Sequence, residues 1–409
     1  MLLEFIVNNA YSYKNEAYFS MEAVSGTKVQ NEFPKFKGHR VLKSAIIFGA
    51  NAAGKSNILN ALGTFQAVVV KPDNLPLPFP SFAGNKEQIS FAIVIQKSGV
   101  IYRYSLDYEE KKVVLEKLEI ENNGEFEVYF ERVKGKYLTV PEGLEIFTNK
   151  TRPENLFLNT AKTFNDEPSL EVYRWFIQDL LIFGSHFQLN PEILKNIEQP
   201  KIKENLLRFL RSADINIQDI EVVEQPMNLN INVLPAELRN FFAHTNFQEA
   251  KSIRLEILHK RFDEQGNRIE DFRLDLFSQE SLGTQKILQL ALIILLNKNK
   301  VILLDEFDSS LHNDLAKALL EVFNSEESSN QFILTSHELS FMDANFKREQ
   351  IYFVERKDNG VSDLYSAYDF AMETSRRDYG YLKRYQKGQF GALPIVLVDS
   401  LKETLKEVR

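Results

Sequence analysis

A lysine and a serine hydroxyl close a short glycine-rich segment near the N-terminus. Residues 49–56 read Gly-Ala-Asn-Ala-Ala-Gly-Lys-Ser and fit the phosphate-binding pattern G-x-x-x-x-G-K-[ST]. Apolar residues 41–48 predict a strand before the segment, and residues 55–70 predict a helix after it. Gly49 and Gly54 would let the backbone turn tightly and approach a phosphate. The alternative is a chance match on a Gly/Ala-rich turn, which the strand–loop–helix context disfavours.

The chemistry expected at this loop is binding of ATP with Mg²⁺. The backbone amides would face the phosphates at the positive end of the helix. Lys55 would reach the β- and γ-phosphates, and the Ser56 hydroxyl would bind Mg²⁺. A guanine nucleotide is disfavoured, because residues 297–300 read Asn-Lys-Asn-Lys where guanine recognition needs a final Asp. The expected nucleotide contacts are Gly49, Asn51, Ala52, Ala53, Gly54, Lys55, Ser56 and Asn57.

Two carboxylates follow a second apolar run. Residues 301–306 read Val-Ile-Leu-Leu-Asp-Glu, which predicts a buried parallel strand that ends in acids. We expect Asp305 to hold Mg²⁺ and Glu306 to act as the general base on the attacking water. A surface pair of acids is the alternative, but acids at the end of so apolar a strand need a partner.

A histidine ends the next apolar run. Residues 331–337 read Gln-Phe-Ile-Leu-Thr-Ser-His, so His337 would follow a strand that comes after the acidic pair. An imidazole at that place can hydrogen-bond the γ-phosphate and distinguish ATP from ADP. A purely structural histidine is the alternative.

A second anion-binding helix start lies upstream of the acids. Residues 280–285 read Glu-Ser-Leu-Gly-Thr-Gln and open an apolar helix at residues 286–296. Ser281 suits the N-cap position, and Gly283 leaves room for a phosphate. Since the first loop already binds this chain's own nucleotide, Ser281 and Gly283 are expected to contact the γ-phosphate held by another copy. The sequence therefore predicts a homodimer around two ATP–Mg²⁺.

Composition restricts the class of protein. The chain has 409 residues, a net charge of −8 and no cysteine, which excludes disulfides, thiolate catalysis and cysteine-based zinc sites. The negative charge argues against a surface covered by nucleic acid, although a local basic patch remains compatible with it. The N-terminus lacks a basic region typical of secretion signals. No apolar run approaches the roughly 20 residues that span a bilayer, so we expect a cytoplasmic protein without a membrane segment.

The order of elements favours an α/β P-loop ATPase head with a mixed sheet, an antiparallel β-layer and a helical insert. Residues 1–165 would hold the loop and the β-layer, residues 166–250 the insert, and residues 251–409 the rest of the head with a C-terminal tail. A hairpin is predicted from runs at 2–8 and 17–21, and an antiparallel β-layer after the loop is predicted from runs at 89–96, 100–108, 112–121 and 125–133. Helices are predicted at 169–182 and 192–212, and further strands at 217–223, 252–258 and 272–277.

Taken together, the motifs resemble an ABC-type ATPase head of the SMC, RecF and overcoming-lysogenization-defect kind. Residues 281–285 resemble the ABC signature, residues 305–306 the Walker B pair, residues 307–312 the D-loop, and His337 the switch histidine. Three features depart from that pattern or have no clear counterpart. Thr284 stands for the signature's second glycine, and His312 stands where Asp is usual. The Q-loop glutamine has three candidates, which are Gln66, Gln88 and Gln96.

The resemblance extends to AAA-family ATPases related to RloA and AbiL-type abortive-infection proteins. It rests on residues 2–5, Tyr13 and Lys14 near the start, and residues 385–394 near the end. It implies an ATP-dependent homodimer in bacterial phage defence that acts with a separately encoded effector, a nuclease or toxin. Tyr13 and Lys14 are candidate base or phosphate contacts, with a solvated turn as the alternative.

Three other functions remain as alternatives. A DNA-binding repair ATPase of the SMC/RecF kind would use the basic residues between 195 and 211, for which a solvated face is the plainer explanation. An ABC transporter subunit is disfavoured by the long insert. A nuclease within this chain is disfavoured by the short segment after His337. The aromatic and basic run 376–385 could dock DNA or a partner, or could pack as a helix on the head.

Overall fold

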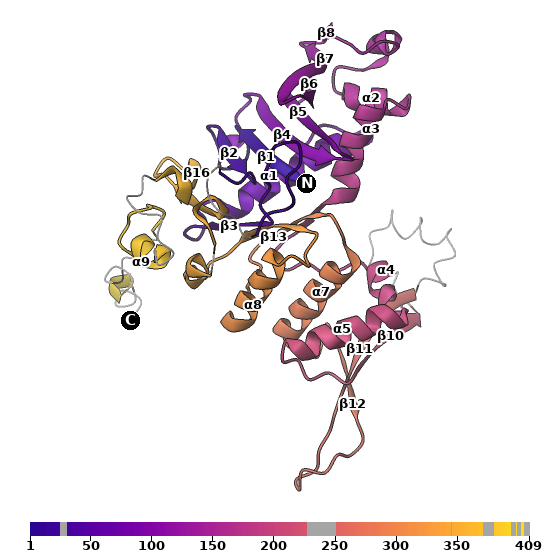
Figure 1. Cartoon of the computed structure of the whole chain (residues 1–409), viewed down its shortest axis with the longest axis vertical. Coiled ribbons are helices and arrows are strands. Elements are labelled where there is room, and N and C mark those ends of the chain that lie inside the picture. The colour runs from indigo at the N-terminus through magenta and orange to yellow at the C-terminus, as the bar shows by residue number, and fades with distance from the viewer. Residues whose placement is uncertain are drawn as a thin grey trace. The chain divides into compact units, whose positions relative to one another are not determined.

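The computed structural model describes residues 1–24, 31–226, 251–344, 346–370, 380–393, 398 and 402–404 (Figure 1). They belong to two compact units. The first unit contains Met1–Ser185, Asn299–Asp308 and Ala316–Arg409. The second contains His186–Lys298 and Ser309–Leu315.

An antiparallel sheet forms one layer of the first unit. Its seven strands lie in the order β2-β1-β4-β5-β6-β7-β8, drawn from indigo to purple in Figure 1. The hairpin turn expected between β6 and β7 is present, with Asn123 and Gly124 at φ 52° and 87°. The predicted β-layer is therefore confirmed. Its strands are β1 Leu2–Asn8, β2 Ala17–Ser20, β4 Ile89–Lys97, β5 Val100–Glu109, β6 Lys112–Asn122, β7 Glu125–Val133 and β8 Lys136–Thr139.

A six-stranded mixed sheet forms the other layer of this unit. Its order is β16-β15-β3-β14-β13-β9, and all neighbours except β15 and β16 run parallel. Because parallel strands end at the same edge, the segments after β3, β13 and β14 meet there. The strands are β3 Ser44–Phe48, β9 Leu180–Phe183, β13 Val301–Leu304, β14 Gln331–Thr335, β15 Ile351–Arg356 and β16 Ser362–Ser366.

Helix α1, Lys55–Val70, packs between the two sheets at the predicted position. The Phe65 ring stacks on Phe91 and Tyr104 of the antiparallel sheet, with ring centroids 5.0 and 5.7 Å apart. The same hydrophobic cluster includes buried side chains of the parallel sheet, among them Ile47, Leu303 and Ile333. Burial on both sides fixes the start of α1 against the sheet edge.

The predicted helix 169–182 is wrong only at its end, residues 180–182, which form a strand. Helix α3, Glu167–Arg174, continues into a wide helical turn at Trp175–Asp179, and then strand β9 begins. β9 pairs in parallel with β13, so it belongs to the core sheet and the first unit. A short apolar run fits a buried strand and a buried helix equally well by periodicity, which explains the error. The second unit starts at His186.

The second unit contains strands as well as helices. The predicted helix 192–212 is interrupted before Pro200, because proline suits the first turn of a helix and disrupts its interior. The sheet order is β10-β11-β12. The elements are α4 Pro191–Leu194, α5 Pro200–Ser212, β10 Asp219–Pro226, β11 Lys251–His259, β12 Phe272–Asp275 and α7 Leu282–Leu296.

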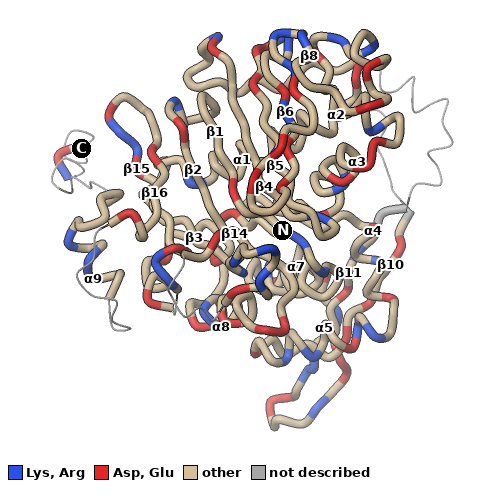
Figure 2. Tube along the Cα trace, turned by 45° about the horizontal axis from the view of Figure 1, so that its top comes forward, with Lys and Arg blue, Asp and Glu red and all other residues tan. Residues whose placement is uncertain are grey.

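Several cations of this region pair with acids, as the mixed colours along α5 in Figure 2 illustrate. Lys203 lies 2.8 Å from a carboxylate oxygen of Asp219, and Arg208 lies 2.8 Å from one of Glu204. Lys195 pairs with Glu192 at 3.1 Å. Such pairing is typical of a solvated face.

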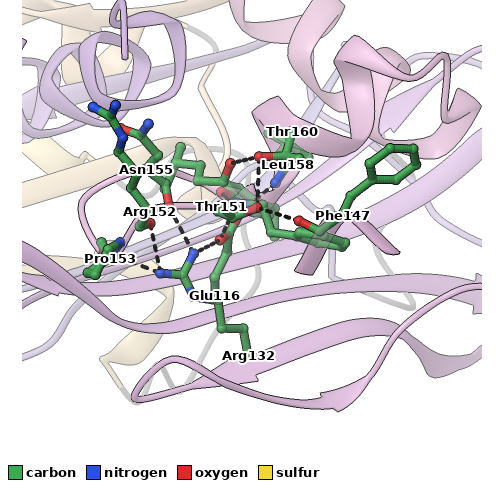
Figure 3. A network of polar contacts seen from close by, with 12 residues as sticks. Glu116, Arg132, Phe147, Thr151, Arg152, Pro153, Asn155, Leu158 and Thr160 are labelled. Atoms are coloured by element: carbon green, nitrogen blue, oxygen red, sulfur yellow. Dashed lines mark hydrogen bonds and ion pairs between the residues drawn. The ribbon is translucent and has the colours of Figure 1, made fainter. Parts of the chain in front are cut away.

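A buried ionic network ties the β-layer to helix α2, Phe157–Thr163 (Figure 3). The Glu116 carboxylate accepts hydrogen bonds from the backbone amides of Phe157 and Leu158, at 2.7 and 2.8 Å, and so caps the helix. The Arg132 guanidinium lies 3.7 Å from Glu116. It also donates to three backbone carbonyls of one loop, those of Arg152, Pro153 and Asn155. Burial raises the pKa of Glu116.

The remaining described helices are α8, Asn313–Asn324, and α9, Tyr381–Gln386. Within α9, the Tyr385 ring stacks on Phe353 of β15, and its hydroxyl donates to the Ala392 carbonyl at 2.6 Å. This part of the run 376–385 thus packs on the head, while residues 371–379 lie outside the described residues. No helix in the described ranges is long and apolar enough to cross a membrane.

Candidate nucleotide-binding site

The loop between β3 and α1 needs glycine at both conserved positions of its pattern. A Cβ on Gly49 would lie 2.4 Å from the Val354 carbonyl oxygen of β15. Gly54 has φ +117°, and a Cβ there would lie 2.5 Å from Ser362 Oγ and 2.7 Å from Ser12 Oγ. No side chain caps the start of α1, and its first turn carries no acid. The helix therefore presents uncapped amides and a positive end to an anion.

Lys55 is folded over this loop. The residue is only 5% exposed, and its ammonium donates to the carbonyls of Gly49 and Ala50 at 2.9 and 3.1 Å. Burial lowers the pKa of Lys55, while the nearby carboxylates of Glu306 and Asp305 oppose that shift. A phosphate in the loop would give this buried charge a stronger partner than the two carbonyls.

Ser56 and Asp305 meet at the sheet edge. Ser56 Oγ donates to Asp305 Oδ1 at 3.0 Å, and Thr335 Oγ1 donates to the same oxygen at 2.5 Å. A hydroxyl beside a carboxylate supplies the hard oxygen ligands that Mg²⁺ prefers. Among the described residues, no group of three or more His, Cys, Asp or Glu could hold a metal by itself. The donor set fits Mg²⁺ that takes its other ligands from phosphate and water.

Glu306 and His337 complete the cluster. The Glu306 backbone has φ +45°, a left-handed conformation that costs free energy in a non-glycine residue and often marks a functional site. Its amide donates to Thr335 Oγ1 at 2.7 Å, while its side chain is 37% exposed. His337 Nε2 lies 3.5 Å from Glu306 Oε1, and His337 Nδ1 lies 3.4 Å from Lys55 Nζ. The imidazole thus lies between the ammonium and the carboxylate.

The structure brings five predicted side chains together, and it adds one that sequence reasoning missed. The five are Lys55, Ser56, Asp305, Glu306 and His337. Thr335 was missed, although a hydroxyl at the end of an otherwise apolar strand was a usable signal. It binds both the Asp305 side chain and the Glu306 backbone.

Ser281 and Gly283 belong to the second unit, at the first turn of α7. Ser281 is the predicted N-cap, and its Oγ accepts the Thr284 amide at 3.1 Å. A Cβ on Gly283 would lie 2.7 Å from the Ser310 carbonyl oxygen, so only glycine fits there. The buried Lys286 donates to Ser309 Oγ at 2.7 Å. The signature turn and the D-loop are thereby held against each other.

The Q-loop candidates do not lie at the sheet edge. Gln66 holds the turn before β9, donating to the carbonyls of Phe176 and Leu180. Gln88 is exposed and Gln96 lies within β4. The strand that does reach the edge is β9, where the Asp305 amide donates to the Phe183 carbonyl at 2.9 Å.

Tyr13, Lys14 and Lys300 lie in different environments. Tyr13 is fully buried, and its hydroxyl donates to the Gly54 carbonyl at 3.0 Å, so it supports the loop from within the core and does not stack on a base. The exposed Lys14 fits the solvated-turn alternative. In the run 297–300, Lys300 pairs with Asp179 at 3.2 Å, which gives it a structural partner and no role in guanine recognition.

Solved structures similar to the chain are SMC head domains. The SMC head domain from Thermotoga maritima has 14% identity and a TM-score of 0.40, covering 89% of this chain and 98% of that one. A SmcHead bound to the C-winged helix domain of ScpA has 16% identity and a TM-score of 0.43, covering 91% and 98%. A Pyrococcus furiosus Smc head with an extended coiled coil, bound to the C-terminal domain of ScpA, has 14% identity and a TM-score of 0.41, covering 89% and 96%. These likenesses are weak.

Comparison with curated proteins gives no match. A family model described as "AAA domain, putative AbiEii toxin, Type IV TA system" matches residues 44–343. The matched span includes the phosphate-binding loop, Ser281, Asp305 and His337. It confirms the predicted fold class, an α/β P-loop ATPase head, whereas the likeness to RloA and AbiL-type proteins stays a prediction. Because the match covers more than half of the 409 residues, the chain belongs to this AAA-domain family.

Proposed function

We propose that the chain is a dimerising ATPase that binds ATP with Mg²⁺ and hydrolyses it to ADP and phosphate. The observation that carries this proposal is the convergence of Lys55, Ser56, Asp305, Glu306 and His337 at one edge of the parallel sheet. Each residue type suits a step of phosphoryl transfer to water. The AAA-domain family supports the same activity.

The roles follow from the contacts in the site. Mg²⁺, when bound, would neutralise phosphate charge, and Ser56 and Asp305 are the residues that would hold it. The Lys55 ammonium would exchange its carbonyl partners for phosphate oxygens. Glu306 would accept a proton from the attacking water, with its backbone fixed by Thr335. His337 would donate to the γ-phosphate, where its contacts with Lys55 and Glu306 would report the state of the nucleotide.

The dimer is the second element of the proposal. Helix α7 begins at a turn capped by Ser281, in which Gly283 packs against the Ser310 carbonyl, and a helix of this length presents a positive N-terminus. In an ATP-bound dimer, Ser281 and Gly283 of one copy would contact the γ-phosphate of the other. This arrangement makes assembly dependent on ATP.

The biological role we propose is that of a cytoplasmic sensor or regulator in bacterial phage defence, acting with a separate nuclease or toxin. The matching family carries a toxin of a toxin–antitoxin system in its description, which supports a role beside a second component. A DNA-repair ATPase is the less favoured alternative, because cations of the second unit such as Lys203 and Arg208 already pair with acids.

The test is the mass in solution of the wild type and of Glu306→Gln, each with and without ATP–Mg²⁺, together with ATP turnover. Glu306→Gln should bind ATP without hydrolysing it, so the dimer should accumulate. Adding Ser281→Arg should abolish the dimer while each copy still binds ATP. An unchanged mass with ATP would refute the dimer, and an absence of ATP binding by the wild type would refute the ATPase.

A further inference from the structure

Three consecutive carbonyl oxygens of the phosphate-binding loop accept hydrogen bonds from side chains outside the motif. Arg356 Nη1 donates to the first at 3.2 Å, Ser362 Oγ to the second at 2.5 Å, and Tyr13 Oη to the third at 3.0 Å. The donors come from the N-terminal turn and from the β15–β16 hairpin. The three carbonyls are those of Ala52, Ala53 and Gly54.

Peptide geometry turns these contacts into an orienting device. In a trans peptide unit, the carbonyl of one residue and the amide N–H of the next point in opposite directions. Holding the Ala53 and Gly54 carbonyls towards the core therefore directs the amides of Gly54 and Lys55 to the opposite side of the loop. Those amides open helix α1, where no side chain caps them. Arg356 acts one peptide earlier, where the Ala53 amide closes a turn onto the Ala50 carbonyl at 3.2 Å.

The donors themselves are fixed by their surroundings. Tyr13 is fully buried, and burial raises the pKa of its phenol, so the hydroxyl stays protonated and can donate. Ser362 is 2% exposed, and its amide donates to the Ser12 carbonyl at 2.8 Å. Ser12 Oγ in turn accepts from the Asn57 side chain at 2.8 Å. Gly54 is enclosed between the hydroxyls of Ser12 and Ser362, so the loop has little freedom to rotate.

We propose that Tyr13 and Ser362, assisted by Arg356, are positioning residues that pre-form the amides which bind the nucleotide phosphates. The inference rests on the proposed ATP-binding function. Because these side chains hold the loop from the side opposite the phosphates, they set nucleotide affinity and leave the hydrolytic step alone. The loop amides cradle the α- and β-phosphates that ATP and ADP share, so both nucleotides depend on the positioning residues to the same extent.

The experiment measures ATP–Mg²⁺ and ADP–Mg²⁺ affinity for Tyr13→Phe, Ser362→Ala and the double variant by titration calorimetry. Each single change deletes one hydroxyl, and the lost hydrogen bond should weaken both nucleotides about 5-fold. The double variant should lose more than either single variant. Turnover at saturating ATP should stay within about twofold of the wild type, since no reacting group is removed. Arg356→Lys should recover part of the affinity that Arg356→Ala loses, because it restores a donor.

Two matched controls lie outside the site in the same unit. Tyr108→Phe removes a buried hydroxyl that donates to the Pro78 carbonyl at 2.8 Å. Ser81→Ala removes a buried hydroxyl that donates to the Asn85 carbonyl at 2.6 Å. Both control substitutions should lower the free energy of unfolding about as much as Tyr13→Phe and Ser362→Ala do, and they should leave nucleotide affinity unchanged.

The possible results separate the two proposals. Wild-type binding together with unchanged affinity in Tyr13→Phe and Ser362→Ala would overturn the positioning role alone. Equal weakening in the two controls would also overturn it, because the effect would then be general loosening of the fold. A fall in saturated turnover at unchanged affinity would contradict it as well. A wild type that binds neither nucleotide would defeat the proposed function, and the positioning role with it.

Discussion

The first unit contains two clusters of charged side chains that differ in their exposure and in their hydrogen-bond partners. In the network around Glu116 and Arg132, both residues are at most 2% exposed. Their hydrogen bonds end on backbone amides and carbonyls and on the Tyr104 hydroxyl. In the cluster around Lys55, the Glu306 and His337 side chains are 37% and 40% exposed, and the ammonium uses the loop's own carbonyls.

The two clusters differ in what supplies the partners of the buried charge. Glu116 caps helix α2, and Arg132 holds the loop that precedes the helix, so every strong partner is supplied by the chain. Around Lys55, a buried cation lies between carbonyls at a helix start that no side chain caps. Because a phosphate oxygen is a stronger acceptor for an ammonium than a neutral carbonyl, an external anion would stabilise this arrangement. The first cluster, the closed network around Glu116 and Arg132, stabilises the fold. The second, the open cluster around Lys55, has side chains that can bind a ligand.

The largest expected effect is on turnover. Glu306→Gln keeps the side-chain shape and removes the base, so saturated ATP turnover should fall by about 10²–10⁴-fold. Glu116→Gln serves as the matched control, because it makes the same chemical change in the closed network. Steady-state phosphate release measures both. Retained turnover in Glu306→Gln, or an equal loss in Glu116→Gln, would remove the distinction between the clusters.

The next effect is on stability. Glu116→Ala leaves Arg132 buried without its acid and leaves the amides of Phe157 and Leu158 without an acceptor. Breaking a buried pair in this way should lower the free energy of unfolding by about 3–5 kcal/mol. Urea denaturation measures this loss. ATP affinity of the folded protein should be unchanged, and a parallel loss of affinity would show that the two clusters are coupled.

The same contrast explains what the sequence could predict. The open cluster was predictable because its chemistry requires fixed residue types at fixed spacings, as in the Gly49–Ser56 loop and the Asp305–Glu306 pair. The closed network was not, because Glu116 and Arg132 look like ordinary polar positions of two strands until pairing brings them together. Strand β9 was missed for a similar reason, since its partner β13 lies far along the chain. Ser362 and Arg356 likewise reach the loop only through sheet pairing.

Lys55→Met should separate binding from stability in the opposite sense to Glu116→Ala. Loss of a charged hydrogen-bond donor should weaken ATP binding by roughly 10–100-fold. Without nucleotide, the unfolding free energy should stay within about 1 kcal/mol of the wild type or rise, because a buried charge is removed. Isothermal titration and urea denaturation give the two quantities. A large loss of stability without nucleotide would show that Lys55 is structural.

The difference in unfolding free energy between the wild type and Lys55→Met should depend on pH, because the pKa of Lys55 is lowered by burial in the folded wild type. A cation whose pKa is lower in the folded state costs stability at neutral pH, where it is charged. As pH rises from that lowered pKa towards the ordinary value of about 10.4, the unfolded chain binds more protons than the folded one. The wild type should therefore gain stability relative to Lys55→Met across that window. If the difference in unfolding free energy between the two proteins did not change with pH, burial of the Lys55 charge would carry no cost.

The smallest effect concerns the backbone of Glu306. Its φ of +45° disfavours any residue with a Cβ, so Glu306→Gly should be about 1 kcal/mol more stable than Glu306→Ala. At Glu321, an exposed position of helix α8, the order should reverse, because glycine costs about 1 kcal/mol relative to alanine in a helix. Thermal unfolding of the four variants gives both differences. Opposite signs at the two positions would show that the fold holds the catalytic candidate in a strained conformation, a cost that no residue of the closed network carries. Equal signs would mean that Glu306 is unstrained and that the open cluster differs from the closed one in its partners alone.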